Sequence, residues 1–167
     1  MEDMEEKNKA RYVEAKQLVS ENIVLLNITE SNTQLIYGDS IDILPYGSKS
    51  ISDDYFKHTP PTESEVEMAI MKIEDELMPS VKKIQTLNLQ LVSFDKRLSE
   101  IITYTTESKK SLSVKEVEGI FSRLAAIITG RPASMDNLPT DNNFTSYVLI
   151  LREIMHHVKF DDIKILS

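Results

Sequence analysis

The sequence contains no cysteine and no tryptophan, and only four of its 167 residues are glycine. Without cysteine the chain can form neither a disulfide nor a thiolate metal site, and it has no cysteine nucleophile. The scarcity of glycine argues against a glycine-rich loop that wraps a phosphate, and against an all-β fold with many tight turns.

Long hydrophobic runs are also missing. No apolar run approaches the roughly 20 residues that a membrane-spanning helix requires. The first residues, MEDMEEKNK, are acidic and polar, unlike a secretory leader. We therefore expect a cytoplasmic protein that does not bind membranes.

Basic residues are too few to form a nucleic-acid surface. The formal net charge is −8, and all of this excess lies in residues 1–83, whereas residues 84–167 are balanced. Lys and Arg supply most of the affinity for a phosphate backbone, so nucleic-acid binding is not expected. An acidic surface that keeps the protein soluble is the simpler explanation of the charge.

Apolar residues at three- and four-residue spacing predict a long amphipathic helix over residues 3–27. Two short β-like runs, 34–37 and 41–46, surround the turn residues Gly38-Asp39-Ser40 and predict a hairpin. Residues 47–54 are polar and are expected to form a loop.

The rest of the chain is predicted to be mainly helical, because capping residues precede apolar stripes. The expected helices run from Thr62 to Pro79, from Asp95 to Thr106, from Ser113 to Gly130 and from Asp141 to Val158. Alternation with a period of two predicts strands at residues 87–93 and 162–166, the second joining the hairpin.

These elements predict one domain over residues 1–167. It would be an α+β, helix-dominated fold of about five helices with a small sheet of three or four short strands. An all-α bundle is the alternative. The N-terminal helix, residues 1–27, would pack on this core or on a second subunit.

The last predicted helix carries the candidate site. Glu153 and His157 are four residues apart and share a face, so they could bind a metal ion. Glu153-x-x-His156 matches half of a di-iron motif, but no second copy exists. Arg152, His156 and His157, with His58 from a distant loop, complete the candidate catalytic set. A surface role and an ordinary Glu153–His157 pair are the alternatives, and no cofactor is expected.

Two further groups of charged residues are candidate ion-binding sites. Glu74-Asp75-Glu76 with Glu67 could hold a hard cation, although a solvated helix flank explains them as well. Arg123 and Arg152 could form an anion pocket if they converged, and an ion pair with Glu153 is the alternative.

Met68, Met71 and Met78 lie away from the main apolar stripe of their helix. They either pack on the N-terminal helix or form an interface with another subunit, since methionine is frequent at binding surfaces.

Because no catalytic motif is present, the sequence favours a non-catalytic protein-interaction or self-assembling domain, as a homodimer or with another protein. The alternative is a small-ligand-binding domain, a metal-binding domain or an enzyme, with its site at the C-terminal end of the last long helix.

Overall fold

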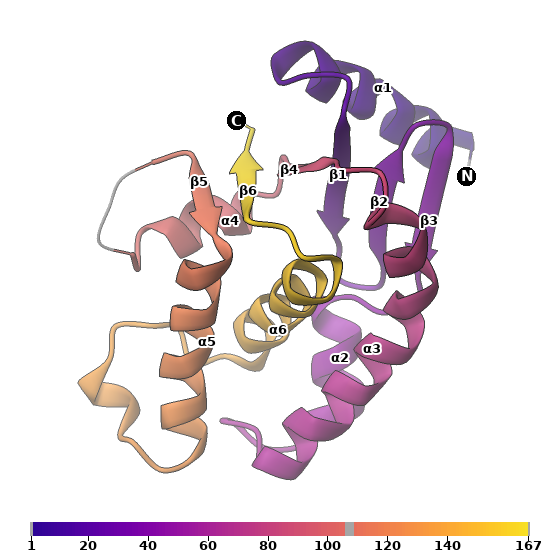
Figure 1. Ribbon diagram of the computed structural model, residues 1–167. Helices are drawn as coiled ribbons and strands as arrows, with labels where there is room; N and C mark the ends of the chain where they lie inside the picture. Colours follow the sequence, from indigo (N-terminus) through magenta and orange to yellow (C-terminus); the bar gives the residue numbers. More distant parts are fainter. Residues whose placement is uncertain (1, 106–108, 167) are drawn as a thin grey trace.

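A six-stranded mixed sheet forms the centre of the computed structural model, which describes residues 2–105 and 109–166 (Figure 1). The strands are β1 (Ile23–Ile28), β2 (Thr33–Tyr37), β3 (Ser40–Leu44), β4 (Gln90–Ser93), β5 (Ser111–Ser113) and β6 (Asp162–Ile165). The helices are α1 (Glu2–Leu18), α2 (Ser48–Tyr55), α3 (Glu63–Ile84), α4 (Lys96–Ile102), α5 (Val114–Ile128) and α6 (Asn142–Val158), with a short 3₁₀ turn η1 (Ala133–Met135).

The strand order is β3-β2-β1-β4-β6-β5. The three strands β1, β4 and β6 run parallel to one another, while β2, β3 and β5 are antiparallel to their neighbours. The register pairs Leu25 with Val92 and Leu91 with Ile163. The carboxyl ends of the parallel strands β1, β4 and β6 therefore lie at the same end of the sheet.

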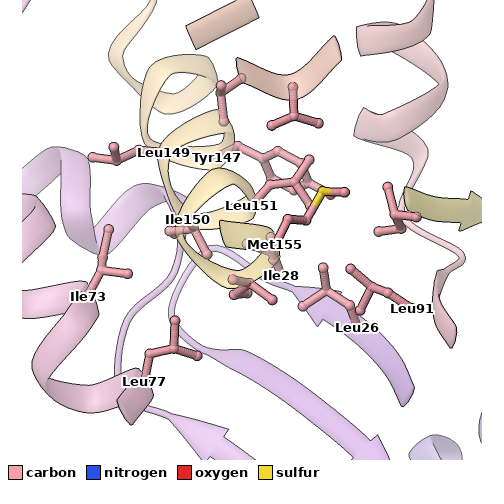
Figure 2. Close-up of a cluster of buried hydrophobic side chains, with 14 of the residues drawn as sticks. Leu26, Ile28, Ile73, Leu77, Leu91, Tyr147, Leu149, Ile150, Leu151 and Met155 are labelled. Carbon is pink, nitrogen blue, oxygen red and sulfur yellow. The ribbon is translucent and has the colours of Figure 1, made fainter. Parts of the chain in front are cut away.

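The two faces of the sheet are covered unequally. On one face α6 lies at the centre, and α2, α3 and α5 pack around it (Figure 1). Leu149 and Ile150, which the helical wheel places off the main stripe, are fully buried because α6 has neighbours on several sides (Figure 2). On the other face α1 contributes Tyr12 and Ala15 to a smaller cluster with β1, β2 and β4.

The predicted fold class is wrong: the structure has a six-stranded mixed sheet and six α-helices, and it is neither a sheet of three or four short strands nor an all-α bundle. The main error lies in residues 3–27. The helix ends at Leu18, and Ile23 begins β1. Because β1 is buried on both faces, its side chains form a continuous apolar run instead of an alternating one, and such a run resembles a buried helix.

Two other elements differ from prediction. The expected loop 47–54 contains α2. The helix expected to stop at Pro79 continues to Ile84 with the proline inside it. A proline within a helix costs about 3 kcal/mol. Burial of Val81 and Ile84 contributes about 1.5–3 kcal/mol for each side chain and so offsets that cost.

The hairpin is confirmed, with β2 and β3 joined at Gly38, whose φ of 55° favours glycine. The capped starts at Thr62, Ser113 and Asp141 are also confirmed. Both proposed strands exist as β4 and β6, but β6 pairs with β4 and β5 instead of the hairpin. The helix predicted from Asp95 to Thr106 is α4, which ends at Ile102; Thr106 itself lies outside the described residues.

Within residues 2–105 and 109–166, no helix is both long enough and apolar enough to span a membrane.

Candidate functional site

A cleft of about 380 Å³ opens at the carboxyl ends of β1 and β4. From β1 the chain proceeds to β2, and from β4 it proceeds through α4 to β5 on the opposite side of the sheet. Open α/β sheets bind ligands at such a point. The lining residues are Ile28, Thr29, Glu30, Ser48, Asp95, Lys96, Arg97 and Tyr147.

Asp95 is the central group of this cleft. Its Oδ2 atom accepts hydrogen bonds from the backbone N–H of Ile28 at 3.0 Å and from the Tyr147 hydroxyl at 2.8 Å. The Asp95 backbone N–H donates to Oγ of Ser93 at 3.0 Å. Three elements, β1, β4 and α6, thus converge on one carboxyl group.

Burial raises the pKa of Asp95 above its usual range, although the hydrogen bonds from Ile28 and Tyr147 and the charge of Arg11 oppose this effect. Burial and the nearby Asp95 charge raise the pKa of Tyr147 well above the usual tyrosine value. The hydroxyl therefore keeps its proton and remains a hydrogen-bond donor. A carboxyl group with a raised pKa is better suited to accept a proton near neutral pH.

Two basic side chains lie beside Asp95. Lys96 is exposed. The Arg97 guanidinium lies 5.8 Å from the Phe144 ring and 5.9 Å from the Tyr147 ring, within cation–π range. Lys96 and Arg97 thus place two basic groups in a lining that also contains Glu30 and Asp95, and Arg97 lies 3.7 Å from Glu100.

The turn between β1 and β2 closes one side of the cleft. The Thr29 and Glu30 carbonyls accept hydrogen bonds from the first backbone amides of α2, at 3.0 Å. A Cβ atom on Gly47 would lie 2.2 Å from the Thr29 carbonyl oxygen, so this close approach requires glycine. Because these amides are engaged within the protein, an anion in the cleft would be held mainly by side chains.

The residues predicted as a metal site meet at the opposite end of α6. Nε2 of His157 lies 3.3 Å from Oε1 of Glu153 and 3.4 Å from Oε1 of Glu74 in α3. The Glu153 side chain is only 3% exposed. One ligand atom from each of the three residues lies within 4.8 Å of the others. The structure thus adds Glu74 to the predicted pair.

The other predicted site residues do not join this group. His156 is exposed and contacts His157 only through its ring, with centroids 5.4 Å apart. His58 is 68% exposed and lies 3.2 Å from Glu65. Of the acidic run, only Glu74 reaches α6, while Glu76 pairs with Lys72 at 3.1 Å and Glu67 and Asp75 are exposed.

The predicted anion pocket of two arginines does not form. Arg123 pairs with Asp136 at 2.6 Å. Arg152 pairs with Glu118 and Glu153, each at 3.0 Å. The alternative, an ion pair between Arg152 and Glu153, is confirmed.

The methionines of α3 are on the surface: Met68 is 52% exposed, Met71 58% and Met78 37%. Packing on the N-terminal helix is wrong, because α1 covers the opposite face of the sheet. That these side chains meet another molecule stays a prediction.

Sequence reasoning missed the role of Asp95. It follows an alternating run and precedes a helix, a pattern that predicts a helix cap. In the structure Asp95 is at the cap position, but its side chain makes no capping hydrogen bond and instead binds Ile28 and Tyr147. An aspartate two residues after the end of a buried strand is the available signal.

No protein-family model matches the sequence, and no curated protein matches it. Solved structures match the fold. The Aquifex aeolicus PPX-GPPA enzyme superposes with a TM-score of 0.66 at 15% identity, covering 87% of this chain and 53% of that chain. A type II variant of the Aquifex aeolicus Ppx/GppA phosphatase gives 0.67 at 13% identity with the same coverage.

An exopolyphosphatase-like protein superposes with a TM-score of 0.66 at 9% identity, covering 87% of this chain and 54% of that one. Because structures with this fold are described as phosphatases, the preference for a non-catalytic interaction or self-assembling domain is overturned, and a homodimer or protein-binding role has no support. The alternative, a ligand-binding domain or enzyme, agrees better with these matches. The chain shares the fold of the Ppx/GppA structures and spans about half of their length.

Proposed function

We propose that this protein is an enzyme domain that binds a phosphorylated ligand of the polyphosphate class in the Asp95 cleft and hydrolyses its terminal phosphoanhydride bond. The observation that carries the proposal is the partly buried side chain of Asp95. Hydrogen bonds from Ile28 and Tyr147 hold its carboxyl group beside the C-terminal ends of the parallel strands. A cytoplasmic location belongs to the same proposal.

The fold supports this choice of ligand. Similar structures are described as phosphatases and as exopolyphosphatase-like, and the polyphosphate class comes from those descriptions. Lys96 and Arg97 would neutralise part of the ligand's charge. Because this chain spans about half of those proteins, binding and hydrolysis are treated as separable parts of the proposal.

In the hydrolytic step Asp95 accepts a proton from a water molecule, whose oxygen attacks the terminal phosphorus. The bridging P–O bond breaks, and its electron pair leaves with the shortened chain. Tyr147 acts as a positioning residue, because its hydroxyl holds the Asp95 carboxylate through Oδ2.

Calorimetric titration with tripolyphosphate tests binding, and release of inorganic phosphate tests hydrolysis. In Lys96→Gln/Arg97→Gln we expect binding to weaken about tenfold, the effect of losing charge-assisted contacts. In Asp95→Asn we expect binding to be retained and phosphate release to fall about 100-fold, the usual contribution of a general base.

Asp54→Asn is the matched control, since Asp54 is exposed and lies in α2 away from the cleft lining. It should behave like the wild type. A wild-type protein that binds no tripolyphosphate at about 1 mM would disprove the ligand class. Binding without phosphate release would remove only the hydrolytic step.

A further inference from the structure

Glu74, Glu153 and His157 come from two helices, α3 and α6, and are held in place by the packing of those helices. Nε2 of His157 is close to both carboxylates, at 3.3 Å from Glu153 and 3.4 Å from Glu74. The exposed fractions of the side chains are 3% for Glu153, 25% for His157 and 40% for Glu74. The three groups therefore surround one position that is open to solvent on the Glu74 side.

The negative charge at this position exceeds the charge that neutralises it. Arg152 is the guanidinium in contact with Glu153, at 3.0 Å, and it is shared with Glu118, also at 3.0 Å. Burial and then the adjoining Glu74 carboxyl raise the pKa of Glu153. Two carboxylates this close require a proton or a cation between them.

A second observation concerns a buried hydroxyl group that is within the electrostatic influence of Glu153. Tyr46 is 1% exposed, and its hydroxyl has no hydrogen-bond partner in the described parts of the chain. Burial is the main cause of the raised pKa of Tyr46, and the charges of Glu76 and Glu153 raise it further. A buried hydroxyl without a partner is uncommon in folded proteins.

We propose that Glu74, Glu153 and His157 bind one divalent first-row transition-metal ion of the zinc class. One imidazole and two carboxylates suit Zn²⁺ better than Mg²⁺, which prefers oxygen ligands alone. Three protein ligands leave a coordination position for water.

This site is distinct from the Asp95 cleft. Tyr147 and His157 are ten residues apart on α6, which corresponds to about 15 Å along the helix. The C-terminal end of α6 leads into the start of β6. It therefore lies at the end of the sheet opposite to the carboxyl ends of β1, β4 and β6. The proposal therefore does not depend on the phosphatase proposal.

The test is titration of Zn²⁺ into the full chain after treatment with a chelator, followed by calorimetry and by non-denaturing mass spectrometry. We expect one Zn²⁺ per chain. Affinity should fall by about 100-fold in Glu74→Gln and in His157→Gln, because loss even of an outer-shell partner costs 10–100-fold. Co²⁺ should give a visible absorption band that both variants lose, whereas Mg²⁺ should bind more weakly.

His156→Gln is the matched control, because His156 is the adjacent histidine on the same helix but is exposed. It should bind Zn²⁺ like the wild type. Equal loss in His156→Gln would indicate nonspecific surface binding and would overturn the proposal. The absence of one-to-one binding at about 1 mM Zn²⁺ would also overturn the proposal. Glu74, Glu153 and His157 would then form only an ion-pair network. Circular dichroism of Glu74→Gln, a substitution at a half-exposed side chain, shows whether this variant is folded. A folded variant that has lost Zn²⁺ binding has lost the site and not the fold.

Discussion

The two ends of α6 differ in how their polar groups are brought together. At the C-terminal end, Glu153 and His157 are neighbours because they are four residues apart on one helix. In the N-terminal half, Tyr147 and the backbone of Ile28 both donate to Asp95, which lies 52 residues from Tyr147 and 67 from Ile28 in the chain. Local helix geometry brings together two of the three members of the first group, whereas only the tertiary fold assembles the second. Groups of the second kind leave little trace in the sequence.

The largest effect is expected where the two ends depend on the same core. Leu151 is fully buried in the middle of α6 (Figure 2). Leu151→Ala should lower the free energy of unfolding by about 2–5 kcal/mol, because it leaves a cavity in packed surroundings. Urea denaturation measures this loss. If the protein remained as stable as the wild type, α6 would not be the common support for both ends.

A change at the cleft end should be smaller and local. Tyr147→Phe removes the hydroxyl that donates to Asp95 but leaves the hydrogen bond from Ile28, at a cost of about 1.5–3 kcal/mol for one lost hydrogen bond to a charged group. Because this hydrogen bond lowers the pKa of Asp95, that pKa should rise further in the variant. Carboxyl NMR titration measures the shift. A change in the Zn²⁺ affinity of this variant would contradict the independence of the two ends.

A change at the other end should alter the pH dependence of stability in metal-free protein. The pKa of Glu153 is raised in the fold, so the folded state retains its proton longer than the unfolded state. This contribution to stability is present below the unfolded pKa and is lost as pH rises through the folded pKa. Glu153→Gln should therefore reduce the decline of stability above the usual glutamate pKa. Denaturation midpoints measured from pH 4 to 8 in EDTA test this; an unchanged profile would contradict it.

The smallest effect is expected at His156, which is exposed beside the metal-site residues. His156→Gln should change the free energy of unfolding by no more than about 0.5 kcal/mol, as for most surface substitutions. Thermal denaturation measures the change. A loss comparable to that of Tyr147→Phe would mean that this histidine supports the structure, and it could no longer serve as the control for His157.

Several features followed from the sequence because they depend on neighbouring residues. The capping boxes at Thr62 and Ser113 mark helix starts through contacts three residues apart, and the Gly38 turn marks the hairpin. The pairing of Glu153 with His157 followed in the same way from helical spacing. In each case the information lies within a few residues.

Other features depended on partners that are distant in the sequence. Ile23–Leu26 form a strand because β2 and β4 supply hydrogen bonds on both sides, and the apolar pattern alone fits a helix equally well. Glu74 joined His157 because α3 packs on α6.

The sequence by itself determined the helix starts, the hairpin and the Glu153–His157 face, because each is a matter of local geometry and backbone hydrogen bonding. Only the tertiary structure decided the six-stranded sheet, the position of Asp95 and the third member of the metal site. Strand order and long-range contacts follow from the burial of whole faces against one another, which no short stretch of sequence specifies.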